Sequence, residues 1–87
     1  MKVVPHAERS ALEIKILSRL FDAGHPLLMR EDIFRLDEID GPRAIARAIG
    51  MAQEGLLFIK DVPADQLVSL TEAGRLYLLE IYRQATA

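Results

Sequence analysis

Two arginines spaced four residues apart have the side-chain chemistry and the spacing to recognise another molecule. Arg43 and Arg47 lie in the stretch DGPRAIARAIGMAQEG, residues 40–55. If this stretch is a helix, both side chains project together from its first two turns, because residues four apart share one face. A guanidinium group donates paired hydrogen bonds to guanine, phosphate or carboxylate groups. Nucleic acid and an acidic protein surface are therefore both candidate targets, and the third alternative is an ordinary solvated helix face.

The remaining ionisable side chains do not form the pattern of an active site or a metal site. The neighbouring carboxylates Glu31–Asp32 and Asp37–Glu38 are predicted on surface turns, without a histidine, cysteine or glycine-rich loop beside them. The sequence contains no cysteine, and its two histidines, His6 and His25, are far apart. A thiol nucleophile, a disulfide and a zinc finger are therefore excluded. We expect no enzymatic activity, no cofactor and no structural metal.

The stretch that carries the two arginines has the start and stop signals of one helix. Asp40 is a good N-cap, and Pro42 suits the first turn. Gly55 can close the helix, and the apolar run LLFI that follows is typical of a strand. Gly50 is expected to admit a neighbouring helix, or a target, at close range. The helical period predicts a buried row and an outer row: Ile45, Ala48, Ile49 and Ala52, and Arg43, Arg47, Gly50 and Glu54.

A long helix is predicted from about Ala7 to Ala23, where Gly24 and Pro26 stop it. Its apolar residues form two rows: Leu12, Ile16 and Leu20, and Ile14, Leu17 and Phe21. This stripe is wider than one partner helix needs, so part of it is available for a second neighbour or a second subunit.

A short extended segment and a second helix are predicted next. Leu27–Met29 is too short for a helix, and Arg30–Leu36 follows it as a helix whose buried side is Ile33, Phe34 and Leu36. The polar segment DEID, residues 37–40, then separates this helix from the arginine-bearing one. That short separation is what a helix-turn-helix requires.

A β-hairpin and a last helix are predicted after residue 55. Leu56–Lys60 and Gln66–Leu70 form its strands, and Asp61–Asp65 forms the turn. Thr71 is the expected N-cap of a helix that runs to about Gln84. The fold class is therefore mainly α with a small β-hairpin, in the order α-β-α-α-β-β-α. Five residues are predicted to meet in its core: Ile45, Ile49, Leu57, Leu70 and Leu76.

The last helix is apolar around most of its circumference: Leu76, Tyr77, Leu78, Leu79, Ile81 and Tyr82. A terminal helix of this kind cannot bury every apolar face within a small domain, so we expect a homodimer. The predicted interface combines the first and last helices: Leu12, Ile16, Leu20, Leu79 and Tyr82. The alternative is that Tyr77 or Tyr82 leans on the surface with its hydroxyl in water.

Length, composition and charge limit the class of protein. The 87 residues are 51% apolar, which is enough for one small domain spanning residues 1–87. No run is long and apolar enough to span a membrane, and the start MKVVPHAERS lacks the apolar core of a signal peptide. We therefore expect a cytoplasmic protein. A net charge of −2 argues against binding nucleic acid irrespective of sequence, which relies on many cationic contacts.

Two sequence segments resemble a known family. LTEAGR, residues 70–75, and EGLL, residues 54–57, resemble the winged helix-turn-helix domains of MarR-like and PadR-like bacterial transcriptional regulators, and the resemblance covers about Leu12 to Tyr82. It implies a dimeric regulator that reads the major groove of double-stranded DNA with the helix from Gly41 to Glu54, while the hairpin lies near the minor groove. The implied DNA contacts are Arg43, Arg47, Arg30 and Lys60.

The hairpin sequence departs from the pattern of that family. MarR-like hairpins usually carry an arginine at the tip, whereas KDVPAD places only Lys60 there, beside Asp61 and Asp65. Two carboxylates would repel a phosphate backbone. The alternative is therefore a winged-helix module that binds a protein partner, such as an adaptor or inhibitor of phage or plasmid type. We expect no ligand pocket in either case.

Overall fold

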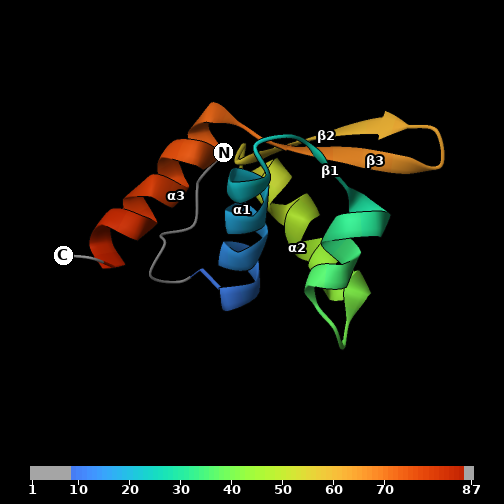
Figure 1. Ribbon diagram of the computed structural model, residues 1–87, viewed down its shortest axis with the longest axis horizontal. Coiled ribbons are helices and arrows are strands. Elements are labelled where there is room, and N and C mark those ends of the chain that lie inside the picture. Colours follow the sequence, from blue (N-terminus) through green and yellow to red (C-terminus); the bar gives the residue numbers. More distant parts are fainter. Residues whose placement is uncertain (1–8, 86–87) are drawn as a thin grey trace.

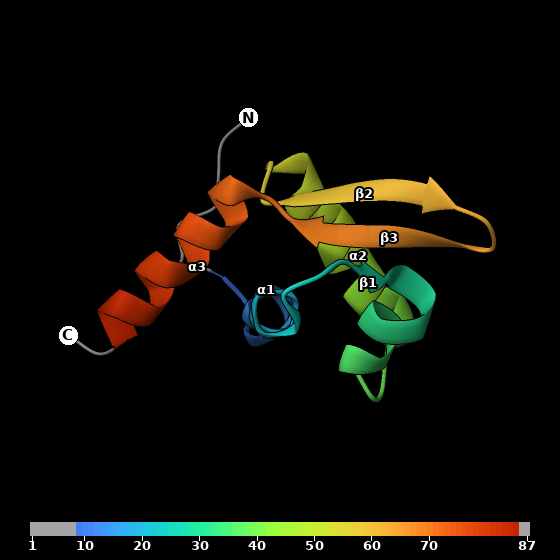
Figure 2. The ribbon, with the colours of Figure 1, turned by 45° about the horizontal axis from the view of Figure 1, so that its top comes forward.

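Residues 9–85, which the computed structural model describes, form three α-helices, two short helical turns and a three-stranded antiparallel sheet (Figures 1 and 2). The helices α1 and α2 pack against one face of the sheet, and α3 leaves the end of β3 and runs beside α1. The elements are α1 (Ala11–Ala23), β1 (Leu27–Leu28), η2 (Met29–Ile33), η3 (Phe34–Leu36), α2 (Gly41–Gln53), β2 (Leu57–Val62), β3 (Asp65–Leu70) and α3 (Glu72–Ala85). This confirms the predicted order, which is compatible with a winged helix.

The sheet has the strand order β1-β3-β2, and its hairpin is tighter than predicted. The strands β2 and β3 pair from Leu57 opposite Leu70 to Val62 opposite Asp65, which leaves a two-residue turn, Pro63–Ala64. The predicted five-residue turn is therefore wrong. Asp61 belongs to β2, where its carboxylate accepts a hydrogen bond of 2.9 Å from the side-chain amide of Gln66 directly opposite.

The core lies between the sheet and the helices, and its fully buried members come from every layer: Ile16, Leu17, Met29, Ile33, Met51, Leu56, Leu78 and Val68. The helix α2 faces this core with Ala44, Ala48 and Met51. Ile49 is 41% exposed and Leu76 is 53% exposed, so the prediction that both are buried is wrong. The small alanine side chains let α2 approach α1 closely. The helix is therefore rotated about its axis relative to the prediction, and Ile49 lies at the margin of the core.

The helix α1 begins later than predicted. Ser10 is its N-cap and forms a capping box with Glu13: the Ser10 hydroxyl accepts a hydrogen bond from the Glu13 N–H at 3.2 Å, and the Glu13 carboxylate accepts one from the Ser10 N–H. The predicted start at Ala7 lies outside the described residues, but residues 9 and 10 are not helical. The end is as predicted, because Gly24 closes the helix in the left-handed conformation with φ 69°.

The predicted helix Arg30–Leu36 is instead two short, irregular turns. The first, η2, is wide, because the N–H of Phe34 donates to the carbonyl oxygen of Met29 five residues earlier. Two carboxylates accept hydrogen bonds from backbone N–H groups at its start. Asp32 accepts one from Leu28 at 2.9 Å, and Asp65 accepts one from Arg30 at 3.0 Å. Side chains thus replace regular helical hydrogen bonds in this segment.

Arg9 connects α1, α2 and α3, and its side chain is only 1% exposed. Its Nη1 atom donates to Glu13 at 2.9 Å, and both Nη atoms donate to the carboxylate of Glu54, at 2.8 and 2.7 Å. Its Nε atom donates to the hydroxyl of Tyr77 at 3.1 Å. The hydrogen bond to Glu54 raises the pKa of Arg9 against the opposing effect of burial, so the guanidinium stays charged.

Thr71 and Gly74 fix the corner where the hairpin enters α3. The Thr71 hydroxyl lies 2.7 Å from the carbonyl oxygen of Gly55 and 2.9 Å from that of Leu56, and it accepts a hydrogen bond from the N–H of Gly74 at 2.9 Å. This confirms Thr71 as the N-cap. A Cβ at Gly74 would overlap the Leu56 carbonyl oxygen, so only glycine lets α3 approach this closely. Thr71 and Gly74 of the LTEAGR segment thus have structural roles at this corner.

Two glycine substitutions should have opposite effects on stability. Gly74→Ala should lower the free energy of unfolding by about 1–3 kcal/mol, because the new Cβ forces α3 away from Leu56. Gly50→Ala should raise it by about 0.5–1 kcal/mol, because no atom lies within 4 Å of that Cβ and alanine favours the helix. Urea unfolding measures both. A neutral Gly74→Ala would contradict the close approach.

Arg9→Met should lower the free energy of unfolding by about 3–5 kcal/mol at neutral pH, because it removes the cation that the nearly buried carboxylates of Glu13 and Glu54 both bind. The control is Arg75→Met, which removes an arginine whose partner, Glu72, lies on the surface. Its effect should be far smaller. Equal losses in urea unfolding would contradict a central role for Arg9.

Acid titration gives a second measure of the same variant. Burial raises the pKa of Glu13, but the hydrogen bonds from Arg9 and Ser10 outweigh it and hold the pKa below its usual value of 4.5. A carboxyl group with a lowered pKa stabilises the fold above its unfolded pKa and loses that contribution as the pH falls through the folded value. The stability of the wild type should therefore fall below about pH 4.5 more steeply than that of Arg9→Met.

Candidate nucleic-acid interface

Two aspartates shape the turn that leads into α2. The carboxylate of Asp37 accepts hydrogen bonds from the N–H groups of Ile39 and Asp40, at 3.1 and 3.0 Å. The bond from Asp40 is the main reason why the pKa of Asp37 lies below its usual value. The carboxylate of Asp40 in turn accepts from the N–H of Arg43 at 3.1 Å, which confirms Asp40 as the N-cap. These bonds fix the first turn of α2 and therefore the base of Arg43.

Arg43, Ala46 and Arg47 are exposed on one face of α2, and the half-buried Gly50 lies on the same face; we call these four residues the arginine face. The Nε atom of Arg43 is 3.9 Å from the Asp37 carboxylate, which is a weak contact. No hydrogen bond or ion pair joins Arg47 to another residue within 9–85. The two longest side chains of this face are thus available for an outside partner.

Two predictions about the outer row of α2 are corrected. No neighbouring helix approaches Gly50, because a Cβ there would meet no atom within 4 Å. Glu54 does not belong to the exposed row, because its carboxylate is bound by Arg9 and is nearly buried. Glu54 is the C-cap of α2, just beyond its last helical residue, and its contact with Arg9 draws it away from the outer row.

The other two predicted DNA contacts lie on other elements. Lys60 is exposed on β2, where it stands opposite Leu67 of β3. Arg30 is exposed on η2, and its backbone is joined to the hairpin through Asp65. The contact of these two residues with DNA stays a prediction.

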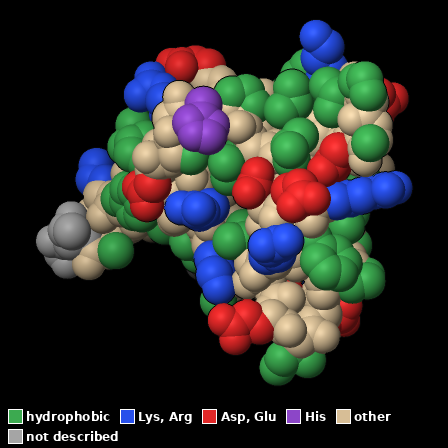
Figure 3. All heavy atoms as spheres, turned by 45° about the vertical axis from the view of Figure 1, so that its right-hand side comes forward, with side chains coloured by type: hydrophobic (Ala, Val, Ile, Leu, Met, Phe, Trp, Pro, Cys, Tyr) green, Lys and Arg blue, Asp and Glu red, His purple; other side chains and the backbone are tan. Residues whose placement is uncertain are grey.

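The acidic residues of the hairpin have structural partners. Desolvation raises the pKa of Asp65, but hydrogen bonds from the N–H groups of Arg30 and Gln66 lower it by a larger amount. The pKa of Asp65 therefore lies below its usual value. Asp61 is bonded to Gln66 across the strands. Figure 3 shows acidic and basic side chains interspersed on one face of the molecule, without a large area of a single sign. Binding through a continuous basic surface is not supported on this face.

The predicted dimer residues are mostly used inside the chain. Leu12, Ile16 and Leu20 are buried in the core, so they are not free to contact a second copy. The Tyr82 hydroxyl donates to Ser18 at 2.9 Å, and its ring packs edge-on against Phe21. Leu79 is half-buried and is not among the residues packed against the core. The homodimer itself stays a prediction.

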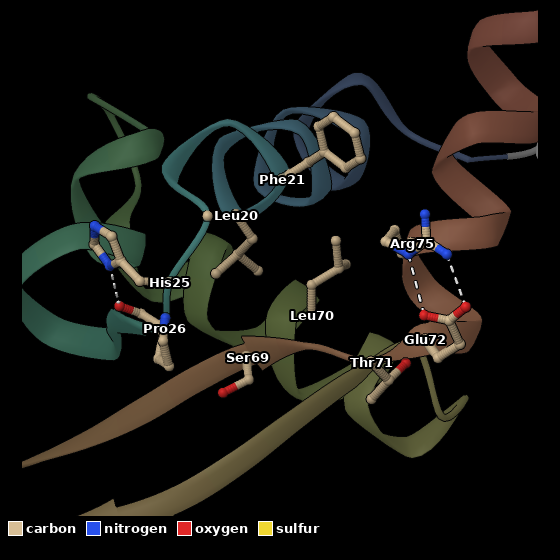
Figure 4. A pocket seen from close by; sticks show the side chains of 10 residues that line it. Leu20, Phe21, His25, Pro26, Ser69, Leu70, Thr71, Glu72 and Arg75 are labelled. Carbon is tan, nitrogen blue, oxygen red and sulfur yellow. Dashed lines mark hydrogen bonds and ion pairs between the residues drawn. The ribbon is translucent and has the colours of Figure 1, made fainter.

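A groove of about 290 Å³ lies between the end of α1 and the start of α3 (Figure 4). Leu20 and Leu70 point into its centre. The charged side chains at its edge are already paired, because Arg75 donates to Glu72 at 3.1 and 2.8 Å. We therefore assign no ligand to this groove.

Two other kinds of site are not found in the part of the chain that the structure describes. Among residues 9–85, no three His, Cys, Asp or Glu side chains gather as a metal site requires. Within the same range no helix has the length and apolar character to cross a bilayer.

The predictions from the sequence did not include Arg9, whose side chain bonds to Glu13, Glu54 and Tyr77. The signal that would have pointed to it is the capping box Ser10-x-x-Glu13, which begins α1 at Ala11 and leaves Arg9 outside the helix. Its partners Glu54 and Tyr77 are far away in the sequence, so their contact with Arg9 could not be read from spacing.

Comparison with known proteins gives no further information about the site. No protein-family model, no curated protein and no solved structure matches this chain.

Asp40→Ala should lower the free energy of unfolding by about 1 kcal/mol, because it removes the acceptor for the Arg43 N–H at the start of α2. Asp22→Ala is the control, since Asp22 is an exposed aspartate on α1. Thermal unfolding compares the two variants. A loss no larger than that of the control would show that Asp40 does not hold the first turn.

Proposed function

We propose that this chain binds double-stranded DNA through the arginine face of α2. The observation that carries the proposal is that Arg43 and Arg47 are exposed on one face of α2. The other residues of that face, Ala46 and Gly50, are small. An α-helix fits the major groove, and arginine can donate two hydrogen bonds to the O6 and N7 atoms of guanine.

The small residues of the arginine face favour a close approach. Neither Ala46 nor Gly50 has a side chain that would hold the helix away from the base edges, so the two guanidinium groups would reach furthest. The capped first turn and the hydrogen bond that Arg9 donates to Glu54 hold the two ends of α2. A rigid helix keeps both arginines at a fixed spacing, which base recognition requires.

The resemblance of EGLL and LTEAGR to MarR-like and PadR-like regulators supports the same proposal. In that arrangement the β2–β3 hairpin, which extends past the helices (Figure 2), would lie along the DNA backbone. Asp61 and Asp65 would oppose phosphate contacts there, with only Lys60 to favour them. We therefore propose binding that depends on few phosphates and on base contacts from α2.

Arg47→Ala should weaken binding to the preferred duplex about 5- to 150-fold, which corresponds to about 1–3 kcal/mol for one base-reading arginine. The duplex is first selected from a random-sequence library by the wild type. The variant should also relax the preference at one position of the site. Arg19→Ala is the matched control, because Arg19 is an exposed arginine on α1, away from the arginine face.

Salt dependence provides the second measurement in the same titrations. Few phosphate contacts release few counterions, so the affinity of the wild type should fall only gently with salt. If the wild type selects no duplex even at low salt, or if Arg43→Ala with Arg47→Ala leaves binding unchanged in a folded protein, the proposal fails.

A protein partner is the second candidate, and one observation favours it. Ile39 is 98% exposed in the turn before α2, where it stands among the acidic residues Asp37, Glu38 and Asp40. Beside the arginine face, this side chain would add apolar buried area to an interface whose other contacts are polar. Under this reading Arg43 and Arg47 would pair with carboxylates on that partner, and Ile39→Lys would abolish its binding without affecting stability.

A further inference from the structure

The face of α3 that points away from the core is apolar in its middle and charged at its ends. Leu76 is more than half exposed, and Leu79 does not pack against the core. Glu72 lies one turn before them and Arg83 one turn after, and both are exposed. The opposite side of the helix is the one that packs inward, through Gly74, Leu78 and Ile81. We call Glu72, Leu76, Leu79 and Arg83 the α3 seam.

The spacing of the α3 seam is that of two packed helices. Its members follow each other at intervals of four, three and four residues, which keeps them on one narrow stripe. A seam of this kind leaves its leucines in water unless a second helix covers them. Within residues 9–85 no other element of the chain covers Leu76, which remains exposed, whereas Leu79 is half-buried.

We propose that the α3 seam pairs with the same seam of a second copy of this chain, in antiparallel orientation. A two-fold axis between Leu76 and Leu79 places Leu76 opposite Leu79 of the second copy, and the reverse. The same axis places Glu72 opposite Arg83 of the second copy at both ends. The seam is therefore complementary to itself both in apolar character and in charge.

Charge decides the orientation of the pair. In a parallel pair, Glu72 would face Glu72 of the second copy and Arg83 would face Arg83, so both ends would carry like charges. In the antiparallel pair, a glutamate faces an arginine of the second copy at both ends. This pairing selects the orientation and register of the two helices and adds little affinity. Inside each copy Arg75 donates to Glu72, and Arg83 donates to Glu80, so these side chains are already held along the helix.

The size of the contact sets the expected affinity. Two leucines from each copy bury less surface than the roughly 1,200 Å² of a stable interface, so the dimer should be weak, with a dissociation constant on the order of 10 µM to 1 mM. Buried leucine provides the free energy of association, and a charge placed in the seam should abolish it.

Sedimentation equilibrium of the full chain without DNA tests the association. The wild type should dimerise below about 1 mM, and Leu76→Lys should weaken dimerisation at least about tenfold while the helix content is unchanged, because Leu76 is exposed in a single copy. Ile39→Lys is the control, since Ile39 is more exposed but lies outside the seam. A monomeric wild type at 1 mM, or equal dimerisation of Leu76→Lys, overturns the proposal.

Disulfide cross-linking tests the orientation, and it is clean because the sequence contains no cysteine. Positions 72 and 83 lie about 16 Å apart along the axis of α3, which is too far for a disulfide. A mixture of Glu72→Cys and Arg83→Cys should therefore cross-link between the two variants, while each variant alone should remain largely uncrosslinked. Faster cross-linking of Glu72→Cys with itself would overturn the antiparallel register. Neither experiment uses DNA, so a failure here leaves the proposed DNA binding standing.

Discussion

The buried guanidinium of Arg9 is the interaction on which the arrangement of the helices depends. Burying a charge is costly, and the cost is offset only where the geometry is good and the donors are satisfied. Here two carboxylates, Glu13 and Glu54, and the Tyr77 hydroxyl meet that requirement from three different helices. The three helices must keep their relative positions for the group to stay satisfied, so a polar contact specifies a packing that apolar contacts alone would leave less defined.

The position of the arginine face follows from this arrangement. Glu54 ties the end of α2 to Arg9, and the inward alanines Ala44 and Ala48 hold the helix close to its neighbours. The side of α2 that remains outside is the one that carries Arg43 and Arg47. The arginine face is therefore exposed because the opposite side of α2 is packed inward. It lies on a helix that is held at both ends.

The acidic character of the surface also has a structural origin. Asp37, Asp40 and Asp65 each accept hydrogen bonds from backbone N–H groups that the turns would otherwise leave without partners. These carboxylates shape the entry to α2 and the junction of η2 with the hairpin, and they lower the net charge as they do so. The proposed DNA binding would therefore rely on a few placed cations, in contrast to attraction by a basic surface.

Local signals in the sequence determined the elements, and tertiary packing decided their faces. Asp40, Gly24, Gly55 and Thr71 marked helix and strand boundaries correctly, because capping and left-handed turns depend on neighbouring residues only. The face of α2 was predicted in part: Ala48 is buried as expected, but the fit against the neighbouring elements buries Ala44 and Met51 and leaves Ile49 exposed. The sequence also did not predict the irregular turns at Met29–Leu36 or the contacts of Arg9, because the partners of these residues come from distant parts of the chain.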